Sequence, residues 1–310
     1  MEKSIEYFNQ AIQKDSSSAL AYAGLANAYS SLGVYGRSDP RDIYPKARAA
    51  ALKALALDDR LSEAHAVLGF CKSVYEWDQS GAERELRRAV ELNPGYAFAH
   101  IWRGEVLSDM GRPKEALAEL DRARELGPTS LMVSDQRGWA LYMARKYDEA
   151  IAQIHKTIEL EPRFAHAHCW FGKVYLQKGM LRAGLAELEA AARLPGGDSK
   201  LYAPWLGYAY ALSGKRGDAF KIIETLTAQD QKGFASPFGV AAIYCGLGQR
   251  DQALAWLENA YQARDPLMAD LSIEPAFDPL RSDARFQDLV RRTLSPYEPR
   301  GERVADRART

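Results

Sequence analysis

Residues 102–128 read WRGEVLSDMGRPKEALAELDRARELGP, which we interpret as two helices joined by a turn at Gly111. Residues 138–162, GWALYMARKYDEAIAQIHKTIELEP, have the same organisation one step of about 34 residues further along the chain. The same step leads to equivalent small residues over most of the sequence, namely Ala26, Gly69, Gly172, Gly207 and Ala241. A fixed period of this length predicts an array of two-helix units stacked on one another.

Other columns of the repeat keep the same register. The second helix of each unit carries a small column, Ala47, Ala82, Ala116, Ala150, Gly184, Ala219 and Ala253, and a largely bulky apolar column, Phe8, Ala51, Leu86, Leu120, Ile154, Leu188, Ile223 and Leu257. Small residues let two helices approach closely, and large ones fill the remaining space to the density of a protein interior. We expect the first helices to end at left-handed caps formed by Gly33, Gly111, Gly179, Gly214 and Gly248.

These columns resemble the tetratricopeptide pattern W-x₂-L-G-x₂-Y…A-x₃-F…P. The best matches are Tyr22-Leu25-Ala26-Tyr29, His168-Phe171-Gly172-Tyr175 and Ala203-Leu206-Gly207-Tyr210, and the resemblance covers about residues 3–265. The chain departs from the pattern where tryptophan is usual, because Tyr22, His65, His100, Ser134, His168 and Ala203 stand there. The resemblance implies an all-α, right-handed superhelical solenoid of antiparallel helix pairs that holds another molecule rather than performing chemistry.

The pattern predicts a leading half repeat, seven full units and a C-terminal cap. The expected ranges are 1–18 for the second helix of a truncated repeat, then units at 19–61 (with an insertion at 34–45), 62–96, 97–130, 131–164, 165–199, 200–233 and 234–265, a capping segment at 266–295, and a disordered tail at 296–310. The cap is expected to contain one helix from Asp278 to Arg292. A solenoid rarely leaves half a repeat exposed, so we expect further protein upstream of Met1.

Three features resemble a narrower group, the bacterial regulators in which a tetratricopeptide array follows a Ser/Thr kinase or a winged-helix domain. They are the insertion, the turn at residues 75–78 (YEWD) and the closing residues 277–286 (FDPLRSDARF). The resemblance implies a regulatory or signalling role for the array. The insertion has two readings, a surface loop whose Tyr35, Ile43 and Tyr44 fold back on the hairpin, or an additional binding element.

Composition argues against several classes of function. The 41 basic and 41 acidic residues balance, whereas a general nucleic-acid binder or a polybasic membrane-surface protein needs excess positive charge. The balanced charge therefore predicts that this chain makes no direct contact with nucleic acid or with a membrane. The three cysteines, Cys71, Cys169 and Cys245, form no CxxC pair, so they indicate neither a disulfide framework nor a zinc cluster. A cytoplasmic location is expected, or an extracytoplasmic one if a transmembrane segment lies upstream.

No catalytic, metal or cofactor motif is evident: GxGxxG, Walker A, HExxH, GxSxG and the kinase signatures are all missing. His166 and Cys169 share a helical face and could act as two metal ligands, but no third ligand is predictably near. Glu105 and Asp135 could resemble a catalytic acid pair, although such residues more often line a solvated groove. We therefore predict no catalytic residue, no metal and no cofactor.

The resemblance places positions two, five, nine and twelve of each first helix on the concave face. The partner-binding groove predicted in this way is lined by Asn27, Phe70, Phe98, Ile101, Glu105, Met132, Asp135, Trp139, Tyr142, His166, Lys173, Leu176, Tyr208 and Phe238. This apolar and aromatic lining favours an extended or helical peptide with apolar anchors, although the same residues could simply fill the space between helices. The family's carboxylate clamp is not expected, because its lysine position is Ala23.

The predicted function is a non-catalytic interaction scaffold or regulatory module that binds a peptide or protein segment in this groove. Two alternatives stay open, a small-ligand sensor domain of a larger signalling protein and an enzyme with an unrecognised site.

Overall fold

The computed structural model describes residues 2–34, 38–194, 199–228 and 235–294. Throughout these ranges the chain is a solenoid of antiparallel helix pairs, which confirms the predicted fold class. After α1 (Glu2–Lys14) the pairs are α2 and α3 (Ala19–Val34, Pro40–Leu57), α4 and α5 (Ser62–Cys71, Gln79–Leu92), α6 and α7 (Ala97–Asp109, Pro113–Leu126), α8 and α9 (Leu131–Met143, Tyr147–Leu160), α10 and α11 (Ala165–Gln177, Leu181–Arg193), α12 and α13 (Ser199–Leu212, Arg216–Thr227), and α14 and α15 (Pro237–Gly246, Arg250–Gln262).

Three short elements and one helix complete the chain. A π-helical turn, η1 (Lys72–Glu76), continues α4, and two 3₁₀ turns, η2 (Pro266–Asp270) and η3 (Pro275–Leu280), lead to the last helix, α16 (Ala284–Leu294). Within the described residues no helix has the length and apolar character needed to cross a membrane.

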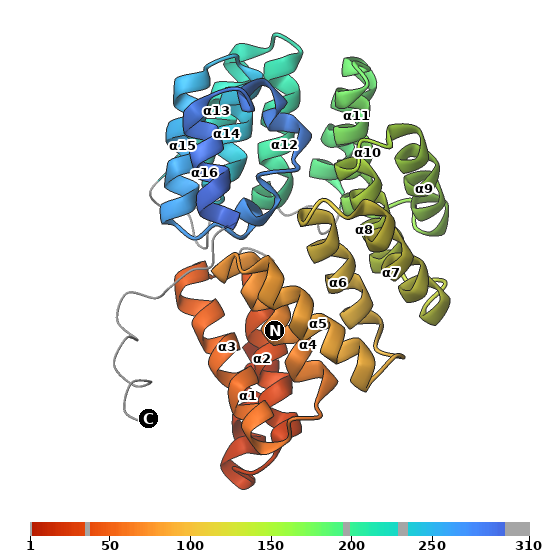
Figure 1. Ribbon diagram of the computed structural model, residues 1–310. Helices are drawn as coiled ribbons and strands as arrows, with labels where there is room; N and C mark the ends of the chain where they lie inside the picture. The colour runs from red at the N-terminus through yellow and green to blue at the C-terminus, as the bar shows by residue number, and fades with distance from the viewer. Residues whose placement is uncertain (1, 35–37, 195–198, 229–234, 295–310) are drawn as a thin grey trace.

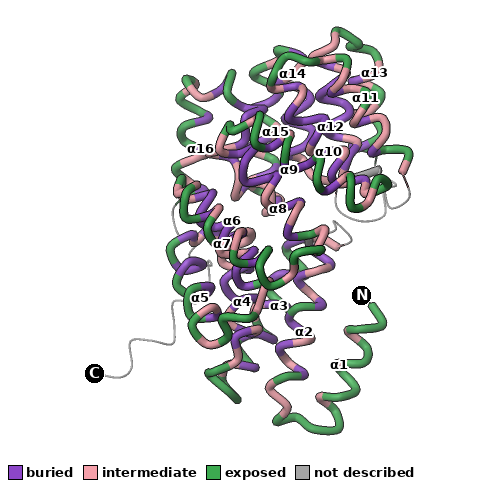
Figure 2. Tube along the Cα trace, turned by 90° about the vertical axis from the view of Figure 1, so that its right-hand side faces the viewer, coloured by how far each residue is buried: buried purple, intermediate pink, exposed green. Residues whose placement is uncertain are grey.

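First and second helices are buried differently. A first helix such as α6 is buried over most of its length, whereas its partner α7 buries only the stripe formed by Ala116, Leu120 and Ala123. Figure 2 shows the same contrast along the array, with the first helices largely purple and the second helices purple on one side only. This is the pattern expected when first helices are enclosed by neighbours and second helices form an outer wall.

The first and second helices of a unit approach each other closely, which explains why small residues recur at the facing positions. A Cβ atom at Gly104 would lie 2.9 Å from Leu120 Cγ, and one at Gly172 would lie 2.5 Å from Leu188 Cγ. At α1 this arrangement is incomplete. The helix packs on α2 through one face, it has no buried residue, and it is green along much of its length in Figure 2.

Histidine at the usual tryptophan position has a structural role. His65, His100 and His168 each place Nδ1 against a glutamate of the second helix, Glu85, Glu119 or Glu187, at 2.6–2.8 Å. In each case Nε2 lies 3.0–3.1 Å from a backbone carbonyl six residues earlier. A carbonyl only accepts, so Nε2–H donates to it, and each ring joins two helices to the preceding turn.

The fourth unit replaces this arrangement with a neutral one. Ser134 Oγ lies 2.7 Å from Thr157 Oγ1 and accepts from Gln153 Nε2 at 2.8 Å. Gln153 occupies the position of the glutamates in the neighbouring units. Loss of the histidine is therefore matched by loss of its carboxylate, which would otherwise be left without a partner.

Two local expectations are wrong. Gly33 does not end a first helix in the left-handed conformation, because α2 continues through it and its bare Cα makes room for Tyr44. The other four glycines do adopt positive φ, from 70° to 76°, and Arg145 adopts φ 59° at the equivalent place in the fourth unit. Residues 40–45 of the expected insertion form the first turns of α3, capped by the Asp39 side chain.

The insertion residues that can be placed fold back on the hairpin. Ile43 and Tyr44 are buried, at 5% and 1% exposure, as the first reading predicts. Tyr35 lies outside the described residues, as does the expected tail at 296–310.

The expected single helix from Asp278 to Arg292 is also wrong. Its first residues belong to the 3₁₀ turn η3, which contains Pro279, and α16 begins only at Ala284, after Asp283 accepts the Arg285 N–H. Proline is tolerated in the first turn of a helix, so Pro279 alone does not exclude the expected start; the α-helical hydrogen bonds begin only where the Gln287 N–H donates to the Asp283 carbonyl.

The array curves so that its C-terminal end comes back against the second unit, where η1 contacts η2. Figure 1 shows α14–α16 lying above α3 and α5. Trp77 is 1% exposed, its ring centroid lies 4.9 Å from that of Tyr261, and the Arg264 guanidinium lies 4.3 Å from its centroid. The second unit therefore contacts the seventh, and residues 265–281, here named the strap, lie inside the resulting ring.

Candidate binding surface

The structure divides the fourteen predicted groove residues into two groups. Five keep some solvent access: Asn27, Phe98, Glu105, Met132 and His166. Nine are buried: Phe70, Ile101, Asp135, Trp139, Tyr142, Lys173, Leu176, Tyr208 and Phe238. The side chains at position two, Phe98, Met132 and His166, are thus accessible to solvent, whereas most side chains at positions five, nine and twelve are buried.

The strap closes the deep positions, and Glu274 is its central contact. Lys173 Nζ lies 3.0 Å from Glu274 Oε2, and the Tyr142 hydroxyl donates to Oε1 at 2.7 Å. The Ala276 N–H also donates to Oε1, at 3.1 Å. Lys173 and Glu274 are 2% and 1% exposed, so the ion pair is formed away from water.

Aromatic rings surround the ammonium group. Lys173 Nζ lies 3.3 Å from the ring centroid of Trp205, 4.3 Å from that of Trp170 and 4.9 Å from that of Tyr142. Such rings attract a cation through their electron-rich faces. We name Lys173, Tyr142, Trp170 and Trp205 the lysine cage. Burial, followed by the neighbouring Glu274 carboxylate, raises the pKa of the Tyr142 hydroxyl, which stays a proton donor.

The outer part of the strap is held by arginines. Arg145 donates to Asp278 at 2.6 Å and to the Ile273 carbonyl at 3.2 Å. Arg281 donates to the Ser272 carbonyl at 2.6 Å. The turn at residues 75–78 and the closing residues 277–286 contribute to the contacts that close the ring and hold the strap.

One part of the strap faces like charge. Burial, with the carboxylates Asp270 and Asp135 nearby, raises the pKa of Glu105 to about 8. Burial and then Glu274 raise the pKa of Asp270 to about 7, while burial and then Asp270 raise the pKa of Asp109 well above its usual range. Asp109 Oδ1 and Asp135 Oδ1 are buried without a hydrogen-bond partner. Asp109 and Asp270 are hydrogen-bonded to each other, and the raised pKa of Asp109 leaves it the proton that this bond needs.

The residues considered for catalysis or metal binding have structural partners. His166 Nδ1 lies 2.6 Å from Asp135 Oδ2, and His168 pairs with Glu187. Burial opposes protonation of His166, but the Asp135 carboxylate outweighs it and the pKa is raised. Burial raises the pKa of the Cys169 thiol to about 12, so it carries little thiolate at neutral pH. Across the described ranges, no group of three or more His, Cys, Asp or Glu side chains is placed to hold a metal ion.

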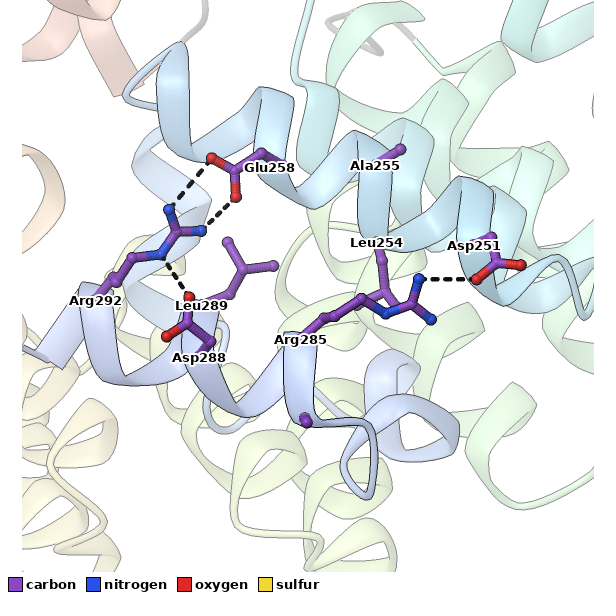
Figure 3. Close-up of a pocket in the computed structure, with 9 residues that line it drawn as sticks. Asp251, Leu254, Ala255, Glu258, Arg285, Asp288, Leu289 and Arg292 are labelled. Carbon is purple, nitrogen blue, oxygen red and sulfur yellow. Dashed lines mark hydrogen bonds and ion pairs between the residues drawn. The ribbon is translucent and has the colours of Figure 1, made fainter.

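A surface hollow of about 560 Å³ lies between α15 and α16 (Figure 3). Two ion pairs cross it, Arg285 with Asp251 at 2.9 Å and Arg292 with Glu258, while Asp288 pairs with Arg292 along α16 itself. The two pairs that cross the hollow attach the cap helix to the last repeat, and none of the predicted groove residues lines it.

The open edge of the inner face is apolar and aromatic. Phe98 and Met132 are 41% and 40% exposed, and His166 follows on the next first helix. The Phe98 ring lies 6.0 Å from Tyr96, while His166 lies 6.1 Å from both Phe164 and Tyr202. We name Tyr96, Phe98, Met132, Phe164 and His166 the rim; Tyr202, against which His166 packs, is buried. Tyr96, Phe164 and Tyr202 were missed in the sequence, because the first two precede a helix and the repeat pattern assigns them no groove position.

The tetratricopeptide repeat family model matches residues 80–130 and 136–199, which supports the repeat assignment, and no curated protein matches the chain. Human IFIT1, solved as a dimer with m7Gppp-AAAA, superposes with a TM-score of 0.61 at 16% identity, over 93% of this chain and 72% of that one. TTC0263, a thermophilic tetratricopeptide protein of Thermus thermophilus, gives 0.51 at 20% identity over 61% and 99%.

A third similar structure is YrrB, a tetratricopeptide protein with an unusual peptide-binding site. It is 27% identical over 64% of this chain and 96% of that one, with a TM-score of 0.42. The similarities to IFIT1 and TTC0263 show that the chain has the fold of a tetratricopeptide solenoid.

Proposed function

We propose that the chain is a non-catalytic scaffold that holds a peptide or protein segment on its inner face, along the rim. The supporting observation is the row of open position-two side chains, Phe98, Met132 and His166, on three successive first helices. Contiguous exposed apolar patches mark interaction sites, and here apolar and aromatic side chains follow one another along the same edge. The deeper groove residues act as the floor on which the rim is built.

The spacing of the rim favours an extended partner. Successive first helices α6, α8 and α10 contact one another, and packed helices lie about 8–10 Å apart. An extended chain in the polyproline II conformation advances about 3.1 Å per residue with three residues per turn, so every third side chain would face the next rim position. The preferred partner is an extended segment with apolar anchors at that interval.

The rim can be tested without disturbing the core. Trp139 and Tyr142 are 6% and 0% exposed, so substitutions there would unfold the array rather than report on binding. The double variant Phe98→Ala, Met132→Ala removes two exposed side chains instead. Met180→Ala is the matched control, because Met180 is 46% exposed at the turn before α11.

Peptides selected from a random display library against the wild-type protein provide the ligand. We expect the selected peptides to carry apolar residues three apart and to bind the double variant about tenfold more weakly or worse, as for loss of central interface anchors. The Met180→Ala protein should bind as wild type. Peptides that bind the double variant as tightly as wild type would place the interaction elsewhere.

A further inference from the structure

The strap already shows how a peptide is held in the centre of the inner face. Its Glu274 carboxylate uses both oxygens, one towards Lys173 and one towards Tyr142 and the Ala276 N–H. Charge-assisted hydrogen bonds of this kind are among the strongest in proteins, and here they are shielded from water. Peptide and array meet through residues more than a hundred positions apart, as a ligand and a receptor would.

The sequence around Glu274 gives the carboxylate its position. Pro275 follows directly as the first residue of η3, where its fixed φ suits the turn and its missing N–H leaves no donor unpaired. Glu274 then caps the turn by accepting from the Ala276 N–H. A glutamate followed by proline therefore presents its carboxylate in a preset geometry, at little cost in conformational entropy.

We propose that the lysine cage is a recognition site for a glutamate followed by proline in a partner protein, and that the chain's own Glu274 fills this site until such a segment displaces it. The inference rests on the proposed scaffold function and adds a second subsite, deeper than the rim. The ligand class is an acidic extended peptide, held through its carboxylate by Lys173 and Tyr142.

The strap has features that allow local displacement. It consists of 3₁₀ turns rather than a full helix, and its outer anchors Arg145 and Asp278 are exposed. The strap's apolar side chains, among them Met268, Leu271 and Phe277, are buried in the core, so a displacing segment must supply apolar groups of its own beside the carboxylate.

The test uses a fluorescein-labelled peptide with the sequence of residues 270–280, DLSIEPAFDPL, and a second peptide in which its glutamate is glutamine. The receptor is the full chain carrying Glu274→Gln, whose tethered strap no longer supplies a carboxylate. Fluorescence anisotropy should show the glutamate peptide binding about tenfold or more tightly than the glutamine peptide, the range expected for hydrogen bonds to a charged group. Wild-type protein should bind it more weakly, because its own strap competes at high effective concentration.

Equal affinity for the two peptides, or no binding to a folded Glu274→Gln protein, would overturn the proposal. If that variant does not fold, hydrogen exchange on the wild-type protein decides. The strap amides should then exchange through a local opening, faster than those in the middle of α10 and α12. Exchange of the strap only together with those core amides means that it never leaves the cage, and the inference fails.

The two proposals fail separately. Library peptides that depend on Phe98 and Met132 but not on a glutamate would leave the rim function standing and remove the cage subsite. A strap peptide that binds while no library peptide needs the rim would do the reverse.

Discussion

The buried pair between Lys173 and Glu274 should be worth much more than any surface ion pair of this chain. Glu274→Gln removes the charge but keeps an oxygen that can accept from Tyr142 and the Ala276 N–H, so the main loss is the partner of the Lys173 ammonium. Lys173 is 2% exposed, and breaking a pair this deep by removing one partner costs roughly 3–5 kcal/mol of unfolding free energy. The rings of the cage compensate in part, because they also attract the cation.

A second substitution should restore most of that loss. In the double variant Lys173→Met, Glu274→Gln no buried charge is left, and a methionine thioether makes favourable contacts with aromatic rings of about 0.3–1.5 kcal/mol. Replacement of a buried ion pair by uncharged groups of similar volume is often neutral or stabilising. The two substitutions should therefore be strongly coupled, by about 3 kcal/mol, rather than additive.

Urea unfolding followed by circular dichroism and tryptophan fluorescence measures this cycle. Arg122→Ala is the control, since Arg122 and Glu125 form an exposed pair and its loss should change stability by less than about 0.5 kcal/mol. The reasoning is refuted if Glu274→Gln is as stable as the control variant, or if the double variant is destabilised by the sum of the single effects.

Three further outcomes are expected. Because the pKa of Glu105 is raised to about 8, the folded chain binds more protons than the unfolded chain between about pH 4.5 and 8, so stability falls as pH rises through this window. In Glu105→Gln the melting temperature should change less with pH between pH 5 and 8.5, and an unchanged slope would contradict this. Gly172→Ala places a Cβ 2.5 Å from Leu188 Cγ and should lower the unfolding free energy measured in urea by about 1–3 kcal/mol. Gly217→Ala in α13 meets nothing within 4 Å and should be neutral or stabilising, so similar effects of the two variants would count against the packing argument. Trp77→Ala should cost about 3–5 kcal/mol and open the ring, seen as a larger radius of gyration in small-angle scattering; an unchanged radius would show that the ring closes without it.

Much of the local structure could be predicted because each unit forms most of its contacts within itself. Gly104 and Leu120 are sixteen residues apart and pack within one hairpin, so the period of the sequence reports the contact directly. The same holds for the first-helix caps at Gly111 and Gly179, where a residue without Cβ adopts positive φ at no steric cost. The histidines at the position where tryptophan is usual mark, in the sequence, the units in which a histidine pairs with Glu85, Glu119 or Glu187.

Solvent access at the candidate site was predicted less well. Phe98 and Met132 are open to solvent, as a groove residue should be, but Trp139 and Tyr142 are buried. Nothing in the spacing distinguishes these pairs, because the same groove positions are open or covered depending on what lies opposite them. Whether the rim and the cage bind a partner stays a proposal for the experiments above.

The helix pairs, most of their caps and their close contacts could be read from the amino-acid sequence, because these depend on residues within about one repeat of each other. Closure of the ring and entry of the strap into it became visible only in three dimensions. Lys173 and Tyr142 lie 101 and 132 residues from Glu274, and they meet it only through the small rotations between units, summed over the array. This accumulated rotation is a property of the whole array and not of any single unit, so the repeat pattern of the sequence does not indicate the contact of Glu274 with Lys173 and Tyr142.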